Sequence, residues 1–159
     1  SAAGLGGLRG GDGCIRIASP AHIAILQERL SGSGIDLAAA RASGQYTDLD
    51  AEETLAKFMR NGWPDERLFI SLVTELLAQA GQGGRRVRAF GEMVSVLWSS
   101  GHPVATVRLE HLWHGLCKKQ AFSLFCAYPR AGFTRDHETS MQEICDAHSR
   151  IVKYPPTIC

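Results

Sequence analysis

The chain has 159 residues, of which 45% are hydrophobic and 21% charged, a composition typical of one folded globular domain. Its 17 basic and 16 acidic residues leave a net charge of +1, which gives no electrostatic reason to expect nucleic acid or an anionic membrane as a partner. Charges interrupt every apolar stretch well before the roughly 20 residues that a membrane span needs. A cytoplasmic protein is expected, because the five cysteines form no C-x-x-C pair and no charged-then-apolar leader opens the chain.

The amino-terminal residues 1–13 contain six glycines, which predicts a flexible lead-in. The stretch contains no G-x-G-x-x-G motif, and no Gly-Lys pair occurs anywhere in the chain. A Walker A phosphate-binding loop is therefore absent. Order is predicted to begin with a β-branched strand over 14–18, and Ser19-Pro20 is typical of a helix start. That helix is predicted to end at the glycines of 32–34.

The remaining elements alternate between strands and helices. Asp50 and Glu53 have the spacing of a capping box, which predicts that a helix follows the strand at 45–49. Helical spacing or a helix-start signal indicates further helices through 68–77, over 92–98, from residue 103 and over 136–148, with strands over 86–90 and 122–128. The apolar run 122–128 predicts a strand covered on both faces. We therefore expect one domain over 14–152, an α/β fold of three α/β/α layers around a mainly parallel sheet, and a Pro-containing tail over 153–159.

Patterns for catalysis or metal binding are weak. His111, His114 and Cys117 have a spacing that suits a metal ion, but they point away from the apolar stripe of their helix, which favours a solvated surface. Ser33 lacks the strand-to-helix turn of serine hydrolases, and neither Cys14 nor Cys126 has an activating cation beside it in sequence. No catalytic residue, metal or cofactor is predicted, and an enzyme is not expected.

The segment 85–93 is more informative, because ligands of parallel sheets bind beyond the carboxyl ends of the strands and Glu92 stands at such an end. Arg88 lies within the same strand and needs a partner there. Contact with a ligand and an internal ion pair with Glu92 are both left open. Trp98 and Tyr128 are expected near the same edge as walls of a pocket for a small organic ligand, although an ordinary core position competes for Trp98.

Several segments resemble, in order, those of the MEDS domain, a sensory domain named for methanogens, methylotrophs and the dichloromethane dehalogenase regulator. They are residues 14–22, 49–55, 88–93, 122–129 and 144–149, and the resemblance extends from about residue 10 to residue 152. It implies a non-catalytic sensory or regulatory module of bacterial and archaeal signal transduction that senses small molecules such as hydrocarbon derivatives. It also implies a fold similar to the RecA-type and circadian-clock ATPases, without their nucleotide chemistry.

The resemblance also suggests partners. A histidine kinase or a transcription-regulator domain is expected to receive the signal through residues 143–152, with Arg88 and Glu92 as polar contacts to the ligand. Family members usually begin with an additional strand and helix, whereas only residues 1–9 precede the matching segment here. We therefore expect a sheet that is completed by another chain, as in a homodimer, or rebuilt around a gap. The alternative function is a degenerate nucleotide-binding or hydrolase enzyme in which Glu92 replaces a Mg²⁺-binding Asp.

Overall fold

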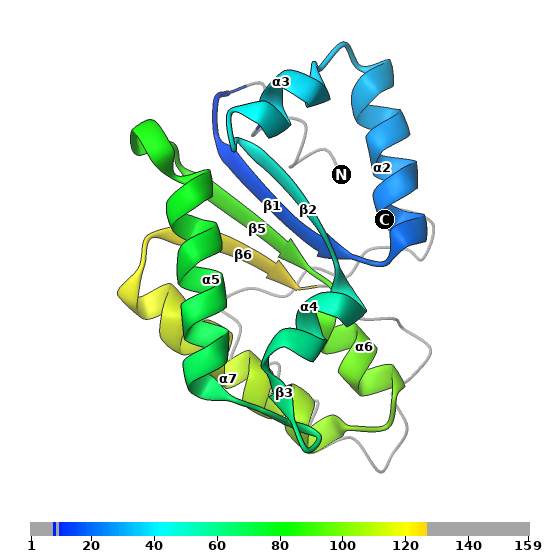
Figure 1. Cartoon of the computed structure of the whole chain (residues 1–159), viewed down its shortest axis with the longest axis vertical. Coiled ribbons are helices and arrows are strands. Elements are labelled where there is room, and N and C mark those ends of the chain that lie inside the picture. Colours follow the sequence, from blue (N-terminus) through cyan, green and yellow to red (C-terminus); the bar gives the residue numbers. More distant parts are fainter. Residues whose placement is uncertain (1–7, 9, 127–159) are drawn as a thin grey trace.

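The computed structural model describes Leu8 and residues 10–126, which form two sheets and the helices around them (Figure 1). The elements in chain order are β1 (Gly13–Ala18), α2 (Pro20–Gly32), α3 (Leu37–Ala42), β2 (Tyr46–Asp50), α4 (Ala51–Phe58), β3 (Met59–Arg60), β4 (Trp63–Pro64), α5 (Glu66–Ala80), η1 (Gln82–Gly84), β5 (Val87–Gly91), α6 (Met93–Ser99), α7 (Pro103–Lys119) and β6 (Phe122–Cys126). The predicted last helix and tail lie outside the described residues.

The main sheet has the strand order β2-β1-β5-β6, and every neighbouring pair is parallel. The short strands β3 and β4 pair separately as an antiparallel hairpin. Helices cover both sides of the main sheet: α2 and α3 lie on one side, and α5 and α7 on the other (Figure 1). This arrangement confirms the predicted three-layer α/β/α fold.

Side chains of each strand alternate between the two faces of the sheet. One face, here called the core face, carries Ile15, Ile17, Val87 and Ala89 and packs against α4, α5, α6 and α7. The opposite face, here called the α2 face, carries the alternate residues, namely Cys14, Arg16, Tyr46, Asp48, Arg88, Phe90, Ser123 and Phe125. Near its β1–β2 half a smaller apolar cluster includes Leu26 and Leu30 of α2 together with Cys14 and Tyr46.

Local signals in the sequence explain most helix starts. The Ser19 hydroxyl accepts a hydrogen bond from the His22 N–H at the start of α2, and the Asp50 carboxylate accepts one from the Glu53 N–H at the start of α4. Both caps were predicted from the sequence. The helix α3 was not predicted, because it has only six residues. Its start is nevertheless capped in the same way, by Asp36.

The core face is centred on an aromatic cluster. The ring of Phe69 in α5 meets the rings of Phe58 and Trp113 edge to face, with centroid distances of 5.3 and 5.0 Å. Phe58 and Phe69 have no exposed surface, and edge-to-face contacts of this kind add to the stabilisation from burial. The aromatic cluster therefore joins α4, α5 and α7 into one packed layer.

The beginning of β1 packs tightly against the end of α5. A Cβ atom at Gly13 would lie 2.2 Å from the carbonyl oxygen of Ala80, so only glycine fits there without a shift of the backbone. Two residues of the predicted flexible lead-in make specific contacts on the α2 face. Leu8 is buried in the cluster of the α2 face, and Asp12 forms an ion pair with Arg88.

Two expectations about the sheet need correction. The prediction that the strand beginning at Phe122 is covered on both faces is wrong, because β6 is the outermost described strand beside β5 and Phe125 is 44% exposed. The physical reason is that α2 and α3 pack chiefly on β1 and β2. In addition, β5 pairs directly with both β1 and β6, so no gap interrupts the described strands, and completion of the sheet by another chain stays a prediction.

Candidate functional site

Glu92 lies where β5 ends, immediately before α6. Its N–H donates to the carbonyl oxygen of Ile17 near the end of the neighbouring strand β1, at 2.8 Å, which places its side chain beside the start of α2. One carboxylate oxygen accepts a hydrogen bond from the Ser19 N–H at 3.0 Å. The other lies 2.5 Å from Nδ1 of His22. Glu92 is only 8% exposed, so the predicted position at a strand end is correct and the carboxylate is buried rather than in bulk water.

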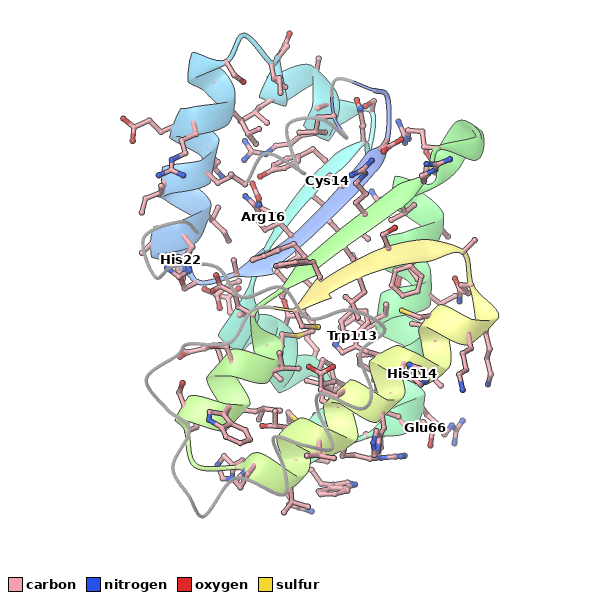
Figure 2. All side chains as sticks on the ribbon, turned by 180° about the vertical axis from the view of Figure 1, so that it is seen from behind. Cys14, Arg16, His22, Glu66, Trp113 and His114 are labelled. Carbon is pink, nitrogen blue, oxygen red and sulfur yellow. The ribbon has the colours of Figure 1, made fainter. Side chains whose placement is uncertain are left out.

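The contacts of Glu92 tie together parts of the chain that are far apart in sequence. Ser19 caps α2 and His22 lies in its first turn, whereas Glu92 leads into α6. A carboxylate at the amino end of a helix is stabilised by the N–H groups and by the helix dipole. With Glu92 ionised, the imidazole of His22 is the donor of their shared hydrogen bond. His22 is exposed at the foot of α2 (Figure 2), so this contact links the buried carboxylate to the molecular surface.

Arg88 is not the partner of Glu92. Its Nε donates to the carboxylate of Asp12 at 2.8 Å, near the amino end of β5, where Arg88 aligns with Cys14 of β1. The internal ion pair between Arg88 and Glu92 that the sequence left open is therefore replaced by one with Asp12. Residues two or four positions apart share a face within a strand, but β5 ends at Gly91, so Glu92 lies beyond the strand and turns toward α2.

The two aromatic residues expected at this edge have different outcomes. Trp98 is buried on α6, the helix that begins directly after Glu92, and its role as a pocket wall stays a prediction. Tyr128 lies outside the described residues. The structure therefore brings Glu92 and α6 together with the start of α2, and it places Arg88 at the other end of β5.

A polar network occupies the β2 side of the α2 face. The carboxylate of Asp48 accepts hydrogen bonds from the hydroxyl of Tyr46 at 2.6 Å, from the amide of Gln27 at 2.9 Å and from the guanidinium of Arg41 at 2.7 Å. Burial and the hydrogen bond to Asp48 raise the pKa of the Tyr46 phenol, so Tyr46 remains a neutral donor. Both carboxylate oxygens of Asp48 thus accept hydrogen bonds from neighbouring side chains.

Arg16 is the unexpected charge of the α2 face. It lies in the middle of β1 and is 6% exposed, and its Nε has no hydrogen-bond partner. Its guanidinium is 5.1 Å from the centroid of the Phe90 ring, a cation–π contact of about 0.5–2 kcal/mol. Leaving a buried charge without an ionic partner costs several kcal/mol, so this contact does not offset the cost of burial.

Phe90 also contacts β6, the outermost described strand. Its ring stacks on that of Phe125 with a centroid distance of 5.7 Å and an interplanar angle of 14°. Phe125 is the more exposed of the two rings. Arg16, Phe90 and Phe125 occupy aligned positions on β1, β5 and β6. They form a row, here called the Arg16 row, that runs from a buried cation to an exposed aromatic ring near the carboxyl ends of the strands.

The described cysteines do not have the properties of nucleophiles. Burial raises the pKa of the Cys14 thiol, and the nearby guanidinium groups of Arg16 and Arg88 oppose this shift without reversing it. The pKa values of Cys117 and Cys126 are also raised, again mainly by burial. A reactive cysteine needs a lowered pKa, so none of these three thiols is activated.

Other chemistry considered from the sequence has no geometric support in the described part of the chain. His111 and His114 are exposed on α7 and Cys117 is half-buried. Within Leu8 and residues 10–126, no three His, Cys, Asp or Glu side chains gather closely enough to hold a metal ion. None of the described helices combines the length and apolar composition that crossing a bilayer demands.

Sequence reasoning missed Arg16 and His22. The signal for Arg16 was present, because an arginine in a short β-branched strand between glycine and a helix cap must be buried or paired. That argument was applied only to Arg88. The role of His22 had no local signal, since its partner is 70 positions away in sequence.

Comparison with known proteins gives one match. No curated protein and no solved structure matches the chain significantly. The family model described as the MEthanogen/methylotroph, DcmR Sensory domain (MEDS) matches residues 5–149, and this range includes β1, Glu92 and the Arg16 row. The chain therefore belongs to the MEDS family of sensory domains.

Proposed function

We propose that this sensory domain binds a small organic ligand beside the carboxyl ends of β1, β5 and β6, and that Glu92 transmits binding to α2. The observation that carries the proposal is the position of Glu92. Its carboxylate is buried between the ends of two central strands and is hydrogen-bonded to Ser19 and His22 in the first turn of α2. A ligand that shifts the end of β5 or the start of α2 must change these hydrogen bonds and therefore how α2 is held.

The local geometry supports a regulatory role over a catalytic one. Both carboxylate oxygens of Glu92 are engaged by α2, and the thiols of Cys14 and Cys126 have raised pKa values. A sensor needs a contact that differs between its free and bound states. The hydrogen bonds of Glu92 to α2 are such a contact, because they join two layers of the fold. The signal would then pass to a partner domain, a histidine kinase or a transcription regulator.

The proposal is tested by binding and by amide exchange together. Toluene, benzyl alcohol, dichloromethane and ATP with Mg²⁺ are added separately, and the thermal unfolding midpoint is measured. A compound that binds only the native state stabilises it by about 2.7 kcal/mol at a concentration of 100 Kd. We expect an organic compound to raise the midpoint and to change hydrogen exchange at residues 19–26. Glu92→Gln should keep binding within about tenfold and abolish the exchange response, because the charged hydrogen bond to His22 is lost.

Glu28→Gln provides the control, because Glu28 is exposed on the same helix. It should leave both the midpoint shift and the exchange response unchanged. Stabilisation by ATP with Mg²⁺ alone would favour the degenerate nucleotide enzyme instead. An exchange response that survives in Glu92→Gln would show that the signal bypasses this carboxylate.

A further inference from the structure

We propose that the ligand of this domain is a small organic monoanion with an apolar body, whose carboxylate pairs with Arg16 and whose apolar part lies along Phe90 and Phe125. This inference rests on the proposed function, since it names the class of ligand for the same end of the sheet. Two independent observations point to it. The first is an unpaired buried cation, and the second is the row of aromatic rings that leads from that cation to the surface.

The charges of the α2 face leave Arg16 as the unmatched cation among the residues that the structure describes. The carboxylate of Asp12 pairs with Arg88, and that of Asp48 pairs with Arg41. Asp48 aligns with Arg16 on the neighbouring strand, but its oxygens are already taken by Arg41, Gln27 and Tyr46. The nearest acidic position on β2 is thus saturated by other donors.

The geometry of Arg16 suits an anionic ligand better than a neutral one. Its Nε is buried and lacks a hydrogen-bond partner, and a guanidinium presents paired N–H groups that match the two oxygens of a carboxylate. The interaction would take place where water is largely excluded, which strengthens it. Arg88 and Arg41, which are more exposed than Arg16, each have an acidic partner, whereas the buried Arg16 has none among the described residues.

The aromatic rings define the rest of the ligand. Phe90 lies against the guanidinium on one side and stacks on Phe125 on the other. Phe125 leaves an apolar edge exposed on the outermost described strand, where α2 and α3 do not provide the main cover. A flat or short apolar body would continue this stack. An aromatic monocarboxylate combines both requirements.

Benzoate and benzamide form a matched pair of probes, because they have nearly the same shape and differ in charge. Their dissociation constants are measured by calorimetry with the wild-type chain and with Arg16→Met, Arg41→Met and Phe125→Ala. We expect benzoate to bind the wild-type chain at least about tenfold more tightly than benzamide, as a charged hydrogen bond implies. Arg16→Met should bring the ratio near one, and Phe125→Ala should weaken both compounds.

Arg41→Met is the control, since Arg41 lies near the same face and pairs with Asp48. It should preserve the preference for benzoate. A second readout needs no ligand: an uncompensated buried charge is destabilising and Met keeps much of the apolar part of the side chain, so Arg16→Met should unfold at the same temperature as the wild type or higher. A clear fall in its unfolding midpoint would mean that Arg16 serves the fold and would overturn the inference.

The outcomes separate this inference from the proposed function. Equal binding of benzoate and benzamide, or no binding of benzoate, overturns the anionic ligand. The proposed function still stands in that case if a neutral compound such as toluene elicits the exchange response that depends on Glu92. If benzoate binds through Arg16 and elicits no response in α2, the ligand class holds and the route through Glu92 fails.

Discussion

The two faces of the main sheet bury different kinds of side chain. The core face buries apolar side chains, with Phe69 packed between Phe58 and Trp113. The α2 face buries or half-buries charged and polar groups, including Arg16, Asp48 and Arg88. Apolar packing stabilises a fold without specific pairing, whereas buried charges must be matched one by one and contribute little net stability. The contrast indicates that the core face holds the domain together, whereas the α2 face carries the polar groups on which the proposed ligand binding depends.

The largest effect that would sharpen this contrast is expected for Phe69→Ala. The substitution removes a fully buried ring and both of its edge-to-face contacts, so the free energy of unfolding should fall by about 3–5 kcal/mol. Denaturant titration followed by circular dichroism measures the change. Leu68→Ala is the control, because Leu68 is the next residue and is exposed; it should change stability by less than about 1 kcal/mol. Comparable losses for the two variants would break the assignment of the core face.

A smaller loss is expected for Asp48→Ala on the α2 face. Removal of the carboxylate leaves the Tyr46 hydroxyl and the Gln27 amide without their acceptor, and each deprived buried group costs about 1–3 kcal/mol before solvent relaxes around it. Because Gln27 and Arg41 are partly exposed and can be hydrated, the cost comes mainly from the buried Tyr46 hydroxyl, and we expect the total to stay within about 3 kcal/mol. Urea titration provides the measurement, with Glu28→Ala as an exposed control. A loss larger than that of Phe69→Ala would mean that the polar network, rather than the apolar core, dominates stability.

The smallest effect concerns the pH dependence of stability. The folded pKa values of Cys14 and Cys126 are raised, so each thiol keeps its proton in the folded state when the unfolded chain has begun to lose it. Their contribution is fully present below the unfolded pKa of about 8.5 and is lost as the pH rises above it. Burial of Cys126 on the core face is opposed by no cation, whereas Arg16 and Arg88 oppose the shift of Cys14.

The two cysteines therefore allow the faces to be compared directly. Unfolding free energies are measured from about pH 8 to about pH 10 for the wild type, Cys14→Ala and Cys126→Ala. Cys126→Ala should flatten the decline of stability with pH more than Cys14→Ala does. The reverse order would contradict the charge distribution described for the two faces.

Much of the fold could be predicted from the sequence, because its signals are local. The caps at Ser19 and Asp50, and the position of Glu92 at a strand end, depend on neighbouring residues or on a short pattern. The partners of Glu92 and Arg88 could not be predicted, since they lie 70 or more positions away. The exposure of Phe125 also depends on strand order, which places β6 beside β5 at the far side of the sheet from α3. Apolarity alone does not tell an outer strand from an inner one.

The glycine at the start of β1 has a mechanical consequence. Gly13 is held against the carbonyl of Ala80 with no space for even a methyl group, so the strand cannot slide toward α5. At its other end β1 leads through Ser19 into α2, where the connection to Glu92 consists of hydrogen bonds that can exchange. A displacement of α2 must then be a pivot about a fixed origin. Leu30, near the carboxyl end of α2, belongs to the same packed cluster as Cys14, the neighbour of Gly13, so the amino end of the helix, beside Glu92, would move the most.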